Sequence, residues 1–157
     1  MKIAAVIGRL LGLLDTILDA LQPLVALGTR WWVSWQFLKS GSLKLSDWDM
    51  TLALFRDEYH TPLLSPGLAA VVGTFGELFF PVLLILGLFG RAAAVGLFAV
   101  NVMAVVSYAY VLLSPGFEGA VGQHYLWGFM LLVLAVYGPG RLSLDHWFGS
   151  RWFPRQP

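Results

Sequence analysis

One carboxylate, Glu77, is the only charge in an apolar stretch that runs from Ala69 to Leu88. As a helix, such a stretch is about 30 Å long and matches the hydrocarbon core of a bilayer. A charged side chain there costs at least ~2.5–3.5 kcal/mol on insertion scales, so it should face a basic partner or a polar cavity. Glu77 is therefore the first candidate for chemistry, either as half of a buried ion pair or as a group that exchanges protons.

Two basic residues of the first apolar segment, Arg30 and Lys39, are the predicted partners of Glu77. Depths counted at about 1.5 Å per residue let Arg30 reach Glu77 from one side and Lys39 reach it from the other. One interpretation is a structural ion pair that fixes helix register, with a hydrogen bond from Asn101. The other is a polar pocket, extended by Tyr108, that binds a quinone carbonyl or conducts a proton.

Two histidines, His60 and His124, belong to a second group of polar residues near the opposite end of the segments. Together with scattered carboxylates they lack the fixed ligand spacing of zinc or copper motifs, so they are weak candidates for a metal site. The chain has no cysteine, which excludes disulfides, thiolate metal sites and iron–sulfur clusters formed by its own residues.

The composition is that of a protein surrounded by lipid. Hydrophobic residues make up 58% of the 157 residues and charged residues only 12%, and the mean hydropathy is +0.74. Soluble domains carry about 25% charged residues, so the class is integral membrane protein. The net charge of +1 indicates neither a nucleic acid nor an acidic partner. The expected partner of the surface is the lipid bilayer.

The apolar segments predict an all-α membrane protein, an up-down bundle of four transmembrane helices. The segments are residues 21–38, 66–88, 92–113 and 120–137, and glycines and prolines mark their ends. Residues 1–20 have apolar side chains at helical spacing and predict an amphipathic helix at the membrane surface. Residues 21–146 would then form the membrane domain and residues 147–157 a cytoplasmic tail.

The loop between the first two segments should contain a short helix. Ser46 or Asp47 can cap its start, and an apolar stripe follows at helical spacing: Trp48, Leu52, Phe55 and Tyr59. This stripe would rest on the membrane or cover the mouth of the bundle as a lid.

Lysine and arginine are concentrated at one end of the predicted bundle. Six of them belong to that end: Lys2, Arg9, Arg91, Arg141, Arg151 and Arg155. By the positive-inside rule both termini are cytoplasmic, and the loop of residues 39–65 faces the periplasm of a Gram-negative cell. The expected location is the bacterial inner membrane.

Four short motifs, in their order and spacing, resemble those of the DoxX family. They are Phe37-Leu38-Lys39-Ser40-Gly41-Ser42-Leu43-Lys44, Gly76-Glu77-Leu78, Gly87-Leu88-Phe89-Gly90-Arg91 and Gly140-Arg141-Leu142-Ser143-Leu144-Asp145. The resemblance covers about residues 22–146. Within the family, Asp47-Trp48, Glu58-Tyr59 and Pro62-Leu63-Leu64-Ser65-Pro66 resemble the HvfX-type branch. That branch is associated with the maturation of copper-binding modified peptides, the bufferins.

The resemblance implies a four-helix inner-membrane protein. Family members are described as subunits of thiosulfate:quinone oxidoreductase, or as parts of membrane oxidoreductase complexes in oxidative-stress defence. The positions that carry over from the family motifs are Arg30, Lys39, Gly41, Lys44, Glu77, Arg91 and Asp145. This chain keeps those residue types and offers no redox group of its own.

Two functional hypotheses stay open at this point. The first is a membrane component of a redox or copper-peptide maturation system, which uses a bound quinone or the cofactor of a partner oxidoreductase. The second is a non-catalytic membrane scaffold, or a factor that handles a precursor peptide or copper. A homo-oligomer is a further expectation, because Gly73 and Gly96 would let helices approach closely.

Overall fold

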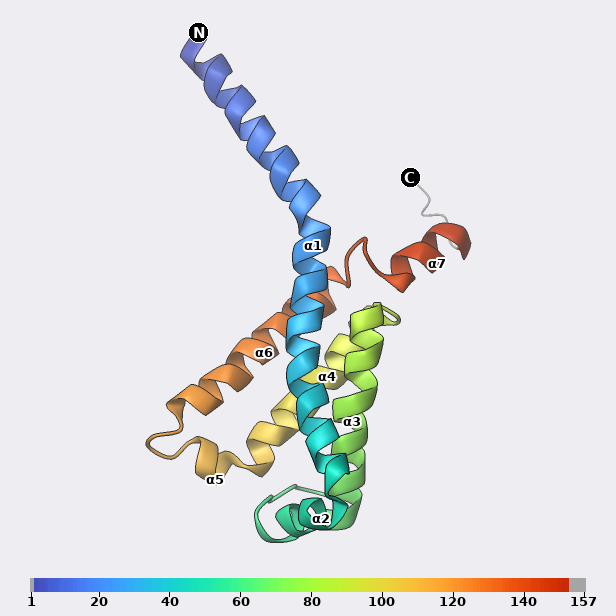
Figure 1. Cartoon of the computed structure of the whole chain (residues 1–157). Coiled ribbons are helices and arrows are strands. Elements are labelled where there is room, and N and C mark those ends of the chain that lie inside the picture. The colour runs from blue at the N-terminus through green and yellow to red at the C-terminus, as the bar shows by residue number, and fades with distance from the viewer. Residues whose placement is uncertain (1, 153–157) are drawn as a thin grey trace.

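The computed structural model describes residues 2–152 and the side chains of residues 6–149. This part of the chain contains helices and no strand (Figure 1). The helices are α1 (Lys2–Ser46), α2 (Trp48–Asp57), α3 (Pro66–Leu86), α4 (Gly90–Ser107), α5 (Ala109–Leu112), α6 (Glu118–Tyr137) and α7 (Leu144–Trp152). By length and composition α1, α3, α4 and α6 could each cross a membrane. The predicted all-α fold with four membrane-spanning helices is confirmed.

Helix α1 is longer than the first predicted span. It runs for 45 residues without a break, and Pro23 lies inside it. The predicted N-terminal helix and the predicted first span are therefore one helix, because the apolar residues continue at helical spacing across residues 20 and 21. Its first half projects away from the other helices in Figure 1, and every side chain from Val6 to Gln22 is exposed. Its placement on a membrane surface stays a prediction.

The spanning helices form two close pairs, α1 with α3 and α4 with α6, joined by the tight α3–α4 hairpin. Helices α1 and α3 approach closely at Gly41, where an added Cβ atom would lie 2.8 Å from Cγ of Leu78. At Gly76 an added Cβ atom would lie 2.6 Å from Val100 of α4. The apolar core lies between the helices and consists of Val33, Phe37, Leu84, Ala93, Ala94, Leu97, Leu131 and Leu134. Small residues thus fix the spacing of the bundle, as in other helical membrane proteins.

The loop helix α2 forms as the sequence predicts. The side chain of Asp47 caps it by accepting a hydrogen bond from the backbone N–H of Met50 at 2.9 Å. Phe55 is buried against the start of α3, in a cluster with Ala69 and Ala70. The other residues of the predicted stripe pack against this cluster: Trp48, Leu52 and Tyr59. The stripe therefore covers the end of α3.

The third predicted span ends earlier than expected. Its helix, α4, stops at Ser107, and the short helix α5 follows a break at Tyr108. The carbonyl oxygen of Ser107 accepts a hydrogen bond at 2.8 Å from the backbone N–H of His60 in the loop. The end of α4 is thus hydrogen-bonded to the segment after α2. The sequence does not reveal this contact, because its helical pattern is uninterrupted here.

At the other end of the bundle, Asp145 holds three chain segments together. Its carboxylate accepts hydrogen bonds from the backbone N–H groups of Phe89 at 2.8 Å and Gly90 at 2.7 Å. Its own N–H donates to the carbonyl of Gly87 at 2.9 Å. Gly87 has a φ of 66°, which favours glycine over all other residues. Asp145 therefore caps the N-terminus of α4 from a distant part of the sequence. We call this end of the bundle, which carries Arg91 and Arg141, the basic end.

The substitution Asp145→Ala should lower stability, because it leaves the first N–H groups of α4 without their acceptor. Loss of a helix cap costs about 0.5–2 kcal/mol. Thermal unfolding of the detergent-solubilised protein should show a lower midpoint, with Asp57→Ala, at an exposed position of α2, as the control without effect. An unchanged midpoint in Asp145→Ala would contradict this role.

Candidate functional site

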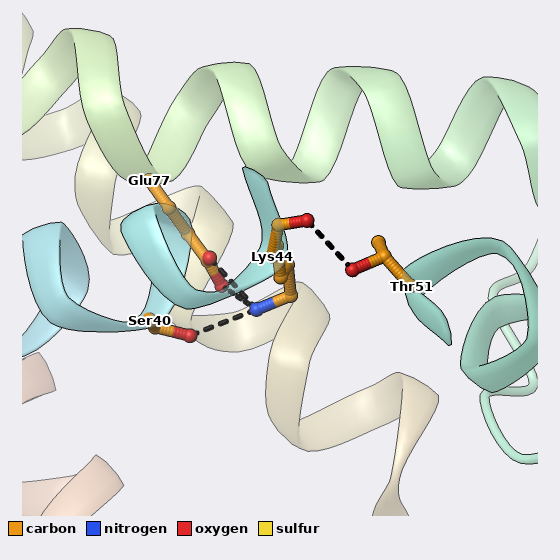
Figure 2. A network of polar contacts seen from close by, with 4 residues as sticks. All are labelled: Ser40, Lys44, Thr51 and Glu77. Carbon is orange, nitrogen blue, oxygen red and sulfur yellow. Dashed lines mark hydrogen bonds and ion pairs between the residues drawn. The ribbon is translucent and has the colours of Figure 1, made fainter. Parts of the chain in front are cut away.

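Glu77 forms an ion pair with Lys44. The ammonium nitrogen Nζ of Lys44 lies 2.9 Å from Oε1 and 2.8 Å from Oε2 of Glu77, and it also donates to the hydroxyl of Ser40 at 2.8 Å (Figure 2). The two charged side chains are only 15% and 10% exposed. The backbone carbonyl of Lys44 accepts a hydrogen bond from Thr51 of α2 at 2.9 Å, which ties the loop helix to this part of α1 (Figure 2).

The structure pairs Glu77 with Lys44 and with neither of the residues that we expected. Lys39 is exposed, because it lies on a different face of α1 from Ser40 and Lys44, which are one turn apart. Lys44 is one of the residues that match the family motifs, and its sequence position alone did not assign it to Glu77. The glycine three residues before it, at the contact between α1 and α3, is the signal that could have found it.

Arg30 lies at the basic end of the bundle, far from Glu77 along both helices. It is fully buried, and its Nη2 donates to the backbone carbonyl of Leu142. Among the described residues its Nε and Nη1 have no hydrogen-bond partner, and an added Cβ atom on Gly87 would collide with Nη1. Arg30 therefore helps to join α1 to the α3–α4 turn and to the segment after α6. Arg91, at the same end, is exposed and lies beside Gly138.

A cavity of about 550 Å³ lies beside the ion pair, and all four spanning helices contribute to its wall. Most of the wall is apolar. The polar side chains that line it are Gln36, Ser40, Lys44, Tyr59, Thr61, Glu77, Ser107, Tyr108 and His124. Two of the five residues predicted for a ligand pocket, Glu77 and Tyr108, are among the lining residues, whereas Arg30, Lys39 and Asn101 are not. Ligand pockets in proteins have this character, an apolar wall with a few convergent polar groups.

His124 of α6 also lines the cavity, and it is held by Asn101 of α4. The amide Nδ2 of the buried Asn101 donates to the backbone carbonyl of His124 at 2.9 Å. Its Oδ1 lies 2.9 Å from Nδ1 of the His124 ring. The ring also packs against Trp127, with 4.9 Å between the ring centroids. Asn101 thus contributes to the site through His124.

His60 belongs to the loop and not to this wall. It is exposed, and its ring packs against Tyr110 with 5.1 Å between centroids. Within the residues that the structure describes, no group of three histidine or acidic side chains is placed to hold a metal ion. The weak metal site proposed from His60 and His124 stays a prediction.

Aromatic residues close the loop end of the cavity. Tyr59 packs between Phe55 and Tyr108, with ring centroids 4.9 and 5.2 Å away. The hydroxyl of Tyr110 donates to the carboxylate of Glu58 at 2.8 Å. Burial, together with nearby acidic and phenolic groups, raises the pKa of Tyr59, and the hydrogen bond to Glu58 raises the pKa of Tyr110. These contacts fasten the loop to α5.

The loop contacts should weaken in alkaline solution. Because folding raises both tyrosine pKa values above their ordinary value of about 10, their contribution to stability is complete below that pH and is lost as the pH rises through the raised values. Absorbance titration of tyrosinate should show two late-ionising groups, one absent from Tyr59→Phe and one from Tyr110→Phe. If the tyrosine that either substitution removes ionises at its ordinary pKa in the wild-type protein, the assignment is wrong.

Removal of one partner of the ion pair should destabilise the protein strongly. Lys44→Met or Glu77→Leu alone leaves an uncompensated buried charge, which costs about 3–5 kcal/mol. The double variant should be clearly more stable than the sum of the two single losses predicts, because no charge is left behind. Thermal unfolding in detergent measures all three, and Lys39→Met, at the exposed lysine of α1, is the control. Additive losses would show that the two charges do not interact.

Comparison with protein families identifies the family of the chain. The DoxX family matches residues 25–109, more than half of the chain, and this range contains the Lys44–Glu77 pair and Asn101. Searches of curated proteins and of solved structures found no match. The chain therefore belongs to the DoxX family of membrane proteins.

Proposed function

We propose that the protein is a component of a membrane redox system and that its cavity binds a lipophilic quinone. The observation that carries this proposal is the position of a buried ion pair at the wall of an apolar cavity between spanning helices. A volume of about 550 Å³ lies within the ~300–1,000 Å³ of ordinary ligand pockets and suits a substituted aromatic ring with part of an apolar tail.

The ion pair suits one carbonyl end of a quinone ring. The ammonium of Lys44 is a hydrogen-bond donor for a carbonyl oxygen and stabilises the negative charge that develops on reduction. Glu77 beside it can exchange protons with such an oxygen. The apolar residues of the wall would hold the rest of the molecule away from water.

Electrons would be supplied by a partner oxidoreductase. The orientation that fits this proposal has both termini in the cytoplasm of a bacterium and the α2 loop in the periplasm, because the basic residues lie at the opposite end. In the HvfX-type branch, the substrate system would be a precursor peptide that becomes a copper-binding product. The loop side would then face the peptide during export.

The second candidate function is a non-catalytic scaffold or peptide-handling factor. The projecting half of α1 favours it, since the apolar side chains of that half are exposed and its backbone projects away from the other helices in Figure 1. Deletion of residues 47–65 should abolish function in this case. The ion pair would then serve stability alone.

Mass spectrometry of mildly extracted protein should detect a bound quinone. The substitution Ala99→Phe places a ring at the cavity wall, on a helix that carries neither member of the ion pair, and should lower quinone occupancy at least tenfold. Ala92→Phe, at an exposed position of the same helix outside the cavity, is the matched control. Absence of quinone from the wild-type protein, and no uptake of added quinone in nanodiscs, would reject the quinone proposal in favour of the scaffold.

A further inference from the structure

The hydrogen bonds between Asn101 and His124 determine which ring nitrogen of His124 carries a proton. The amide nitrogen of Asn101 donates to the backbone carbonyl of His124, so the amide oxygen faces Nδ1 of the ring. The reverse amide orientation would place two carbonyl oxygens 2.9 Å apart, which is repulsive. Because an amide oxygen only accepts hydrogen bonds, Nδ1 must be the protonated nitrogen.

The neutral His124 ring therefore has an unprotonated Nε2. Among the described residues no group bonds to Nε2, and this atom is not enclosed by protein. His124 itself lines the cavity. Its Nε2 lone pair is thus a free hydrogen-bond acceptor on a residue of the cavity wall.

The surroundings hold the ring in this state. Gly128, one turn after His124, leaves room for the Asn101 amide, since a Cβ atom there would lie 3.3 Å from Nδ2. The ring of Trp127 packs against the His124 ring, with 4.9 Å between the ring centroids. Trp127 also packs against Phe37 of α1, with 5.7 Å between the ring centroids. Three helices therefore fix the position and the tautomer of one imidazole.

The carboxylate of Glu77, unlike Nε2 of His124, already has a hydrogen-bond donor. Both of its carboxylate oxygens accept hydrogen bonds from Lys44, at 2.9 and 2.8 Å. A ligand hydroxyl would have to compete with this ammonium for Glu77, whereas it meets no competitor at His124.

We propose that Nε2 of His124 is the hydrogen-bond acceptor for the ligand, and that Asn101 is the residue that positions it. For the identity of the ligand this inference rests on the proposed function, and it refines that function. The cavity should prefer a lipophilic phenol or hydroquinone, which has an O–H donor, over the corresponding quinone or methyl ether, which has none. Lys44 would contact the other polar end of the molecule.

Nitrogen-15 NMR of histidine-labelled protein in nanodiscs tests the tautomer directly. The chain has three histidines, and His60→Gln and His146→Gln identify the signals of the other two. For His124 we expect a protonated Nδ1 and an unprotonated Nε2, and Asn101→Val should give a mixture of tautomers. A wild-type His124 with its proton on Nε2 would overturn the proposal.

Titration of the same sample with a phenol tests the role of Nε2. 4-Octylphenol should shift the Nε2 signal of His124 and leave those of His60 and His146 in place, and 4-octylanisole, its methyl ether, should shift none. The phenol should bind at least tenfold more tightly than the ether, and His124→Phe should abolish this preference. A His124 signal that does not respond to the phenol would overturn the proposal.

The two proposals fail in different ways. If a quinone is bound but Nε2 of His124 ignores phenols, the acceptor role is wrong and the quinone function stands. If Nε2 responds to the phenol but no quinone is retained or taken up, the acceptor role stands and the quinone function is wrong.

Discussion

The contact between α1 and α3 at Gly41 determines where the charge of Glu77 can be compensated. The two helices are antiparallel, with Arg30 beside Gly87 and Gly41 beside Glu77. Lys44 therefore starts about one turn nearer the loop than Glu77 does. Side chains of a helix lean toward its own N-terminus, so Lys44 and Glu77, on antiparallel helices, lean toward each other. A bulkier residue in place of Gly41 would separate the helices at the level of the pair.

The cavity follows from an uneven use of small residues. Near the basic end, neighbouring side chains occupy the space beside the glycines, as Pro139 of the segment after α6 does at Gly90 and Ala26 of α1 does at Gly140. Near the loop, the small residues Ala69, Ala99 and Ala104 line open space instead. Phe55 and Tyr59, supplied by the loop, close part of this space. The ion pair is thus buried without being packed on every side, which leaves room for a ligand next to it.

The sequence predicts the number and type of the elements well, because apolar length and helical spacing are local properties. It predicts the loop helix from Asp47 and its apolar stripe for the same reason. It does not predict the relative rotation of two helices, and that rotation determines which lysine pairs with Glu77. Lys39 and Lys44 are five residues apart and so point in different directions from α1, and only the packing at Gly41 shows which one faces α3. Depth along the helix axis, which the sequence does give, could not separate them.

Long-range polar contacts were equally hidden. Asp145 and Gly90 are 55 residues apart, and Asn101 and His124 are 23 residues apart. In each pair, the helical pattern of the sequence shows only that the side chain lies in the interior or at a turn. It does not give the partner of that side chain. The family resemblance identified Asp145 as a motif residue without giving its partner. The structure shows that Asp145 caps the start of α4.

The polar groups of the interior differ in whether the protein satisfies them. Glu77 has both oxygens bonded by Lys44, and Asn101 uses both ends of its amide on His124. Groups that are satisfied in this way stabilise one arrangement of the helices, and a ligand has to compete with their protein partner. His124 has one nitrogen bonded and one free. An acceptor without a partner is costly in an apolar wall, so this nitrogen favours a ligand that brings a hydrogen-bond donor into the cavity. The same reasoning makes the ion pair a structural contact that also sets the electrostatics of the site, and it assigns recognition of a hydrogen-bond donor to His124.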